Sequence, residues 1–310
     1  MQKKILITGG AGFIGSCLAE RLIEDKDNYV VIVDDLSTGS LSKLPTNPKD
    51  NWCFIKCDVN NYKDIAEVMH SFHFDYVFHY AATVGVLRTQ ENPVKVLHDL
   101  RGIEYILNLS KNSRVEHVYF SSSSEVYGEP VTFPQNEYTT PLNSRIPYAV
   151  VKNVGESFLR SYKKEYNLNY TIFRFFNTYG PKQSSDFVIS KFVDKAIKNQ
   201  DIAIYGDGSQ TRTFCYIDDN IEACYKVFRE GKLQNDVMNV GGNIEVPIIE
   251  LTKKIIELTG SSSKIVFLPP LEEGDMTRRL PDNSKMRNIL NRELITLDEG
   301  LKKVIENPFL

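Results

Sequence analysis

Apolar and polar positions along the first half of the chain follow two alternating patterns. Short apolar runs rich in Ile, Val, Phe and Tyr have the length and composition of buried β-strands. Between them lie stretches whose apolar residues recur every three or four positions, as on one face of a helix. Strands that alternate with helices form βαβ units, whose sheet is parallel and covered on both faces. The predicted strands are 4–9, 29–35, 52–59, 74–82, 116–124 and 169–180, and the predicted helices include 61–72, 94–113 and 147–167.

This alternation ends near Gly180. Beyond it, residues 186–200 and 246–260 have the pattern of amphipathic helices, but no regular succession of strands separates them. The second half of the chain is therefore predicted to form a smaller lobe. The expected fold class is α/β, a Rossmann-type doubly wound parallel sheet with a smaller α+β lobe.

Composition and charge argue against several classes of protein. The 310 residues carry a net charge of −3, which gives no basic surface for nucleic acid. No apolar run approaches the roughly 20 residues that span a bilayer, and Met1 leads into a strand without a signal peptide. The five cysteines are odd in number and contain no CxxC pair, so we expect reduced thiols in a cytoplasmic protein. The five histidines are irregularly spaced, so no metal site is expected.

A glycine-rich turn joins the first predicted strand to the first predicted helix. Gly9, Gly12 and Gly15 stand at GxxGxxG spacing, with Phe13 and Ile14 between the last two. Glycines permit a tight turn and close backbone approach, and a helix N-terminus offers N–H groups and a positive dipole to a pyrophosphate. For a glycine triplet taken alone, a turn needed only for packing is the alternative.

Acidic residues at two later strand ends favour a dinucleotide site. Asp34 ends the second strand about twenty residues after the glycines, where a carboxylate can accept hydrogen bonds from both ribose hydroxyls. An acid there would repel a 2′-phosphate and no arginine is adjacent, so NAD is favoured over NADP. Asp58 and Val59, at the end of the third strand, could receive the adenine edge. A helix cap is the alternative role for Asp58.

Tyr148 and Lys152 form a YxxxK pair one helical turn apart, so both lie on one face of the predicted helix. A tyrosine with its ordinary pKa near 10 is a poor base at neutral pH. A nearby lysine cation, together with a positive nicotinamide ring, would stabilise the phenolate and lower that pKa. The serine run before Glu125 could add a hydroxyl that shares the substrate proton.

Several segments together resemble one family. They are TGGAGFIGS, VDDLSTG, FHYAA, SSSSEVYG, PYAVVK, RFFNTYGP, YGDGSQTRTFCYIDD, NVGG and RRLPD, in this order along the chain. The chain resembles the extended short-chain dehydrogenase/reductases that act on nucleotide sugars as epimerases, dehydratases or decarboxylases, and the resemblance covers nearly the whole length. It implies an NAD-binding Rossmann domain at 1–180, to which later segments return, and a mainly nucleotide-sugar-binding lobe at 181–310.

The resemblance also implies roles for individual residues. Tyr148 would remove the proton of the sugar 4-hydroxyl while C4 gives its hydride to NAD, and Lys152 would hold the nicotinamide ribose. Ser123 matches the family's catalytic serine or threonine. Asn177 and Arg212 match residues that hold the nucleotide diphosphate, for which the guanidinium fork is well suited. Further matches are Ala81 and Ala82 at the cofactor and Tyr205 at the substrate.

Residues beside Ser123 bear on the reaction that follows oxidation at C4. Ser124 and Glu125 resemble the Thr-Ser-Glu of decarboxylases acting on UDP-glucuronate (UDP-xylose synthases) more than the Thr-Asp-Glu of 4,6-dehydratases. GDGSQTRTFCY is similar to the GDGSQTRSFCY of these decarboxylases, and RRLPD places Arg279 where they carry an arginine implicated in loss of CO2. The expected function is therefore NAD-dependent decarboxylation of UDP-glucuronate or a related UDP-uronic acid.

Two departures from the decarboxylases keep other reactions open. The loop at 83–93 lacks their Ser-Pro-Ala type sequence and is closer to the epimerases, and Asp99 stands where the family usually has asparagine. A C4 epimerase acting on a UDP-hexose or UDP-uronate is the first alternative and a 4,6-dehydratase the second. Outside the enzymes, a silent NAD-binding scaffold is the alternative. Glu125 could be a helix-start carboxylate without chemistry, and Arg279 a surface residue.

The resemblance further implies a homodimer formed through the helices at 94–113 and 147–165. The segment at 205–219 is interpreted as a diphosphate clamp, in which a Gly-Asp-Gly turn delivers Arg212 to the phosphates. Asp218 and Asp219 are expected to cap the helix that follows them.

Overall fold

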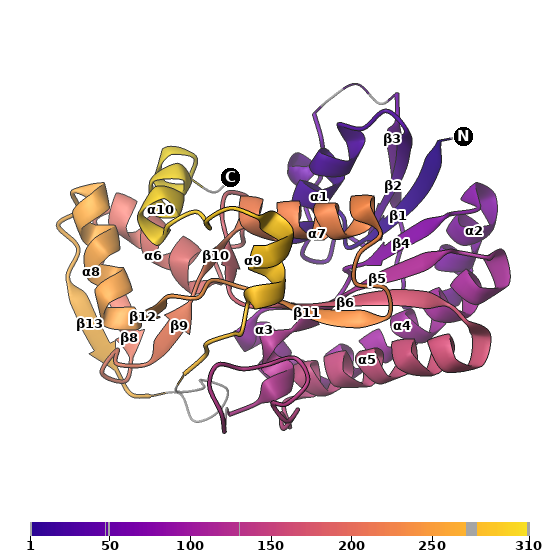
Figure 1. Ribbon diagram of the computed structural model, residues 1–310. Helices are drawn as coiled ribbons and strands as arrows, with labels where there is room; N and C mark the ends of the chain where they lie inside the picture. The colour runs from indigo at the N-terminus through magenta and orange to yellow at the C-terminus, as the bar shows by residue number, and fades with distance from the viewer. Residues whose placement is uncertain (1, 47, 49, 130, 271–277, 309–310) are drawn as a thin grey trace. The chain divides into compact units, whose positions relative to one another are not determined.

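The computed structural model contains one seven-stranded sheet (Figure 1). It describes residues 2–46, 48, 50–129, 131–270 and 278–308. The seven strands are β1 (Lys3–Thr8), β2 (Asn28–Asp34), β3 (Trp52–Lys56), β4 (Tyr76–His79), β5 (His117–Ser123), β6 (Asn169–Phe175) and β11 (Asp236–Val240). Their order is β11-β6-β5-β4-β1-β2-β3, and β1 pairs in parallel with both β2 and β4. This is the doubly wound order, so the predicted α/β fold is confirmed.

Helices cover both faces of this sheet (Figure 1). One face packs against α2 (Tyr62–Phe72), α4 (Pro93–Ser113) and α5 (Pro147–Tyr166), which share a cluster of buried apolar side chains with the strands. The other face meets α1 (Phe13–Ile23) and the later part of α7 (Ile217–Glu230), whose Phe228 contacts the rings of Phe78 and Tyr119. Strands buried on both faces explain the nearly continuous apolar runs of the sequence.

The chain divides into two compact units. Unit 1 contains residues 1–126, 147–174 and 224–238, and unit 2 contains residues 127–146, 175–223 and 239–310. In unit 2, three two-stranded sheets pair β7 (Thr178–Tyr179) with β10 (Cys215–Tyr216), β9 (Thr211–Thr213) with β12 (Glu245–Pro247), and β8 (Ile202–Tyr205) with β13 (Ile265–Leu268). Its helices are α6 (Val188–Ile197), α8 (Ile248–Thr259), α9 (Ser284–Leu290) and α10 (Leu297–Glu306). The assignment of cofactor and sugar binding to separate parts of the chain stays a prediction.

Several predicted elements differ from the structure. The strand predicted at 52–59 ends at Lys56. The single strand predicted at 169–180 is divided into β6 and β7, because Asn177 between them has a φ of +29° and leaves the extended conformation. The strand predicted at 74–82 ends at His79, because the hydroxyl of Thr8 accepts the N–H groups of Tyr80 and Ala81. The segment at 83–93, expected as a loop, contains the short helix α3 (Val86–Glu91).

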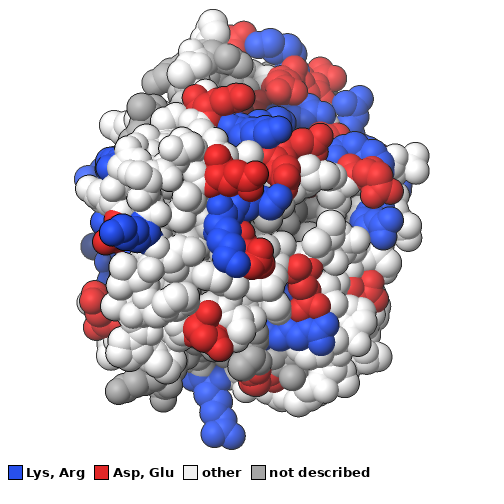
Figure 2. Space-filling view, turned by 90° about the vertical axis from the view of Figure 1, so that its left-hand side faces the viewer, with Lys and Arg blue, Asp and Glu red and all other residues white. Residues whose placement is uncertain are grey.

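Acidic and basic side chains are interspersed on the face of the molecule shown in Figure 2. Unit 2 has several exposed ion pairs of this kind, among them Lys254 with Asp298 and Lys253 with Glu250. Such exposed pairs contribute little to stability. None of the described helices is both long and apolar enough to cross a membrane.

Candidate active site

The glycine-rich turn between β1 and α1 has no room for side chains. Gly9 has a φ of +68°, and a Cβ atom on it would lie 2.7 Å from the backbone of Ala81. A Cβ atom on Gly15 would collide with the carbonyl oxygen of Gly9. The α1 N-cap is Gly12, the first turn contains no acidic residue, and the first helical hydrogen bond runs from Ser16 N–H to Gly12. The N–H groups of Phe13, Ile14 and Gly15 thus precede the first intrahelical bond, as a pyrophosphate site requires.

Asp34 ends β2 beside this turn. Its carboxylate accepts the N–H of Ala11 at 3.0 Å and the N–H of Leu36 at 2.8 Å. Burial raises the pKa of Asp34, and these two hydrogen bonds oppose the rise. Each carboxylate oxygen can accept a further hydrogen bond, so the side chain fits the ribose hydroxyls of a dinucleotide. Gly39 is required here, because a Cβ atom would lie 2.6 Å from the carboxylate.

The residues expected beside the adenine lie just after β3. Asp58 accepts the N–H of Asn60 at 2.9 Å, whereas α2 is capped by Asn61, which accepts the N–H of Lys63. The alternative of a helix cap at Asp58 is therefore wrong. Val59 is buried, and Ala81 and Ala82 follow β4 with their side chains partly exposed.

The structure brings the predicted catalytic pair, Tyr148 and Lys152, together within unit 1. Lys152 Nζ lies 5.8 Å from the centroid of the Tyr148 ring, and it donates to the hydroxyl of Ser121 at 3.3 Å. Ser121 in turn donates to the carbonyl of His79 at 3.3 Å. Ser121 was not among the predicted site residues. Its only sequence signal was its place in the same serine run as Ser123.

Lys152 is almost fully buried, with 2% of its surface exposed. Burial lowers the pKa of Lys152 to about 8, and the carboxylate of Asp99 opposes this shift. Burial and the charge of Lys152 lower the pKa of His79 to about 3, so His79 is neutral and shares a hydrogen bond with Thr8 at 2.8 Å. The ammonium group therefore supplies the positive charge beside Tyr148 at neutral pH.

Ser123 ends β5, and Ser124 and Glu125 begin the short 3₁₀ helix η2 (Ser124–Tyr127). The hydroxyl of Ser123 accepts the N–H of Glu125 at 3.2 Å, which fixes its oxygen at the end of the strand. Ser124 is buried and Glu125 is half-buried. Glu125 lies in the first turn of η2, as its helix-start interpretation expects.

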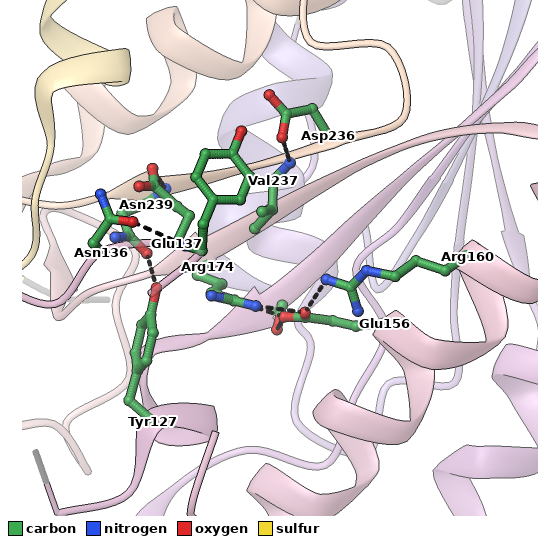
Figure 3. A network of polar contacts seen from close by, with 11 residues as sticks. Tyr127, Asn136, Glu137, Glu156, Arg160, Arg174, Asp236, Val237 and Asn239 are labelled. Atoms are coloured by element: carbon green, nitrogen blue, oxygen red, sulfur yellow. Dashed lines mark hydrogen bonds and ion pairs between the residues drawn. The ribbon is translucent and has the colours of Figure 1, made fainter. Parts of the chain in front are cut away.

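A buried ionic network holds α5 against β5 and β6 (Figure 3). Glu156, fully buried, accepts both Nε and Nη2 of Arg174 at 2.8 and 2.7 Å. It also accepts the hydroxyl of Ser122 at 2.7 Å and Nη2 of Arg160 at 3.0 Å. Glu156 lies one turn after Lys152, and Ser122 lies between Ser121 and Ser123. The network therefore fixes α5 against the serine run.

The predicted substrate residues all lie in unit 2. Asn177 donates to the carbonyl of Thr213 at 2.9 Å, which ties the turn after β6 to the strand of Arg212. Arg212 is buried on β9 and donates to the carbonyl of Thr211. Tyr205 ends β8 and is half-buried. Arg279 exposes only 6% of its surface, so its interpretation as a surface residue is wrong.

The backbone that follows Arg279 is anchored. Gln135 N–H donates to the carbonyl of Leu280 at 2.7 Å, and Asp282 N–H donates to the carbonyl of Gln135 at 2.8 Å. The neighbouring Arg278 makes a bidentate pair with Glu245 at 2.6 Å, and β12, which begins at Glu245, pairs with the strand of Arg212. Two arginines adjacent in sequence thus differ in role, because Arg278 pairs with a carboxylate on β12 while Arg279 is buried.

The predicted caps of α7 need correction. The helix begins at Ile217, so Asp218 and Asp219 lie in its first turn rather than before it. Asp219 accepts the N–H of Ile295 at 2.8 Å and pairs with Arg292 at 2.6 Å. It links α7 to the segment that precedes α10. Among the described residues, no group of three or more His, Cys, Asp or Glu side chains is arranged to hold a metal ion.

Comparison with known proteins identifies the family. The model of the NAD dependent epimerase/dehydratase family matches residues 5–241. The chain belongs to this family. It is therefore an NAD-dependent enzyme that modifies nucleotide sugars, and NAD as the predicted cofactor is confirmed. The glycine turn and the position of Asp34 are of the kind that binds this cofactor.

Individual relatives differ in the reaction that their names give. The chain is 36% identical to the "Putative UDP-glucose 4-epimerase" of Methanocaldococcus jannaschii, over 97% of each chain. It is 34% identical to the UDP-N-acetyl-alpha-D-glucosaminuronate decarboxylase of Bacillus cytotoxicus, over 99% of this chain and 98% of the relative. The structure of UDP-glucose 4-epimerase from Thermotoga maritima with UDP-glucose superimposes with a TM-score of 0.91 at 32% identity, covering 98% of both chains. Isomerases and lyases are thus about equally similar to this chain.

Proposed function

We propose that the protein is an NAD-dependent decarboxylase of UDP-glucuronate or a related UDP-uronic acid. The observation that carries this proposal is a second buried arginine in unit 2. Arg212 and Arg279 each expose less than a tenth of their surface. One guanidinium suits the diphosphate that all nucleotide sugars share. A uronic acid brings one further negative charge, its C6 carboxylate, for which Arg279 is the proposed partner.

Tyr148, Lys152 and Ser123 would carry the oxidation of C4. NAD, when bound, supplies reversible hydride transfer at this carbon. Tyr148 would remove the proton of the 4-hydroxyl, because the Lys152 ammonium favours its phenolate. Ser123 would share that proton through its hydroxyl. Lys152 would also donate to the ribose hydroxyls of the cofactor.

Loss of CO2 then follows from the chemistry of the oxidised sugar. A ketone at C4 makes the C6 carboxylate a β-keto acid. When the C5–C6 bond breaks, its electron pair moves into the ketone as an enolate and CO2 leaves. Protonation at C5 and return of the hydride to C4 give the pentose. Ser124 and Glu125 would move the proton at C5, and Arg279 would hold the carboxylate until the bond breaks.

Mass spectrometry of the product tests the reaction directly. The purified enzyme with NAD and UDP-glucuronate is expected to release CO2 and give a UDP-pentose. Arg279→Gln should abolish this release but retain NAD binding, since Arg279 is outside unit 1. Arg278→Gln is the matched control, because it removes the neighbouring guanidinium, which pairs with Glu245. An unchanged product mass would contradict decarboxylation.

A C4 epimerase is the second candidate function. It is favoured by the segment at 83–93, whose sequence is closer to that of the epimerases. An epimerase would give a product of equal mass with a different chromatographic position, from a UDP-hexose or a UDP-uronate. Loss of water would instead indicate a 4,6-dehydratase. If Tyr148→Phe left any of these activities unchanged, the proposed base would be wrong.

We also propose that α4 and α5 form the interface of a homodimer. Val94 and Leu97 on α4 and Tyr166 on α5 are exposed apolar or aromatic side chains of the single chain. Burial of such side chains stabilises association. Sedimentation velocity is expected to give twice the mass of the chain, and Leu97→Glu should reduce it to the monomer mass.

A further inference from the structure

Asp99 is a buried acid on α4 that the proposed reaction does not use. Only 8% of its surface is exposed. Its Oδ2 accepts the backbone N–H of Thr83 at 2.7 Å, and its Oδ1 accepts the side-chain amide of Asn60 at 3.1 Å. The hydroxyl of Thr83 is a longer contact, 3.4 Å from Oδ1. A carboxylate this deeply buried requires such donors, because an unpaired charge would be strongly unfavourable.

The donors around Asp99 require two acceptor atoms at this position. Asn60 Oδ1 accepts the backbone N–H of Gly102 at 3.0 Å, and a backbone N–H can only donate. The NH2 group of Asn60 must therefore point to residue 99. The N–H of Thr83 also points there, so both oxygens of the side chain must accept. An asparagine would offer one acceptor and place its own NH2 group against a donor.

Two segments proposed to contact NAD meet at this carboxylate, and a third is within reach of its charge. Asn60 belongs to the turn of Asp58 and Val59, and Thr83 directly follows Ala81 and Ala82. The approach of α4 is close, because a Cβ atom on Gly102 would lie 2.6 Å from Asn60 Oδ1 and 3.1 Å from Val59. The third segment is α5, where the charge of Asp99 acts on Lys152.

We propose that Asp99 is a positioning residue whose carboxylate joins the turn after β3, the turn after β4 and the catalytic lysine into one cofactor site. Its two oxygens hold the two turns in register. Its negative charge stabilises the ammonium form of Lys152. This inference rests on the proposed roles of Asp58, Ala81 and Lys152, but it holds for decarboxylation and epimerisation alike.

Asp99 supplies the negative charge that compensates the buried ammonium group of Lys152. From β4 comes His79, which is neutral, and from β5 comes the hydroxyl of Ser121. From α5 comes Tyr148, and from α4 comes Asp99. Without the carboxylate, burial would lower the pKa of Lys152 further below about 8. The ammonium group would then be lost at lower pH, and the alkaline limb of the pH–rate profile would move to lower pH.

Asp99→Asn tests both parts of the inference. We expect the dissociation constant for NAD to be about tenfold higher, because one buried donor loses its acceptor. We also expect the alkaline limb of the pH–rate profile to move to lower pH. NAD affinity is measured by titration calorimetry, which needs no nucleotide sugar, so the result does not depend on the proposed reaction. Thr83→Ala is the matched control. It removes only the long hydroxyl contact. It should leave the NAD affinity and the alkaline limb of the pH–rate profile close to those of the wild type.

The double variant Asp99→Asn/Asn60→Asp separates positioning from folding. The carboxylate introduced at position 60 would accept from Gly102 and from the new amide at position 99, whose oxygen would accept from Thr83. We expect NAD affinity to recover. The alkaline limb of the pH–rate profile should remain at lower pH, because the carboxylate is no longer on α4. Asp99→Glu, which keeps the charge, should keep the limb in place. The proposal would be overturned if Asp99→Asn left both the NAD affinity and the alkaline limb of the pH–rate profile unchanged. It would also be overturned if Asp99→Asn lost both activity and fold and the double variant did not restore them.

Discussion

The network around Glu156 allows one quantitative prediction. Glu156→Gln keeps the shape of the side chain but removes the charge that faces Arg174, whose guanidinium is 1% exposed. A carboxamide offers one acceptor where the carboxylate has two oxygens that together accept from Arg174, Arg160 and Ser122. Arg174 would remain a buried cation that faces a neutral amide in place of the Glu156 carboxylate. The expected loss in the free energy of unfolding is about 3–5 kcal/mol.

Arg160 supplies the matched control for this change. Its side chain is 44% exposed, so water solvates the guanidinium when the pair with Glu156 is broken. Arg160→Gln is therefore expected to cost at most about 1 kcal/mol. Both values are measured as changes in the free energy of unfolding by urea denaturation at pH 7. Equal costs for Glu156→Gln and Arg160→Gln would refute the reasoning, because burial would then make no difference to the two ion pairs.

The same pair predicts the direction of a pH effect. Burial alone would raise the pKa of Glu156, but the hydrogen bonds and charge of Arg174 outweigh it, so the pKa is lowered. A carboxyl whose pKa is lower in the folded state stabilises the fold above its unfolded pKa, about 4.3 for glutamate. This contribution is lost as the pH falls through the folded pKa. Urea denaturation of the wild type and Glu156→Gln should therefore converge in acid, and a constant difference between them would contradict the assignment.

Three further outcomes follow from the structure. Gly15→Ala should abolish NAD binding measured by calorimetry, because its Cβ atom would collide with the carbonyl of Gly9; retained affinity would mean that the turn can open. Turnover of the wild type should fall as the pH rises past about 8, where Lys152 loses its proton, and a profile flat to pH 10 would exclude this ammonium from the mechanism. Thr296→Ala removes the capping box of α10 and should cost about 1 kcal/mol by urea denaturation, whereas no loss would show that the cap is dispensable.

The features predictable from sequence were those fixed by neighbours along the chain. The glycine turn depends on the spacing of Gly9, Gly12 and Gly15, and the Tyr148–Lys152 pair depends on one helical turn. The contacts missed by sequence analysis join distant segments. Lys152 meets Ser121 from 31 positions away, and no local pattern distinguishes that serine from its neighbours.

Conformations set by tertiary contacts were also missed. Asn177 leaves the extended conformation within an apolar run that has the pattern of one strand. Its amide donates to the carbonyl of Thr213, 36 positions away, which no pattern within the run could reveal. Asp219 looked like a helix cap because its partners, Ile295 and Arg292, lie more than 70 positions later. Such roles depend on which segments the fold brings together, and a single sequence does not display that.

The interleaving of the two units has a consequence for the order of synthesis. Unit 1 includes residues 224–238, which supply Phe228 against Phe78 and Tyr119 and most of the edge strand β11. A nascent chain of 180 residues would therefore expose the aromatic face of an incomplete sheet. We expect the Rossmann sheet to be completed only after the ribosome has made the first two segments of unit 2, 127–146 and 175–223. A shortened gene that ends at residue 180 would therefore yield aggregates.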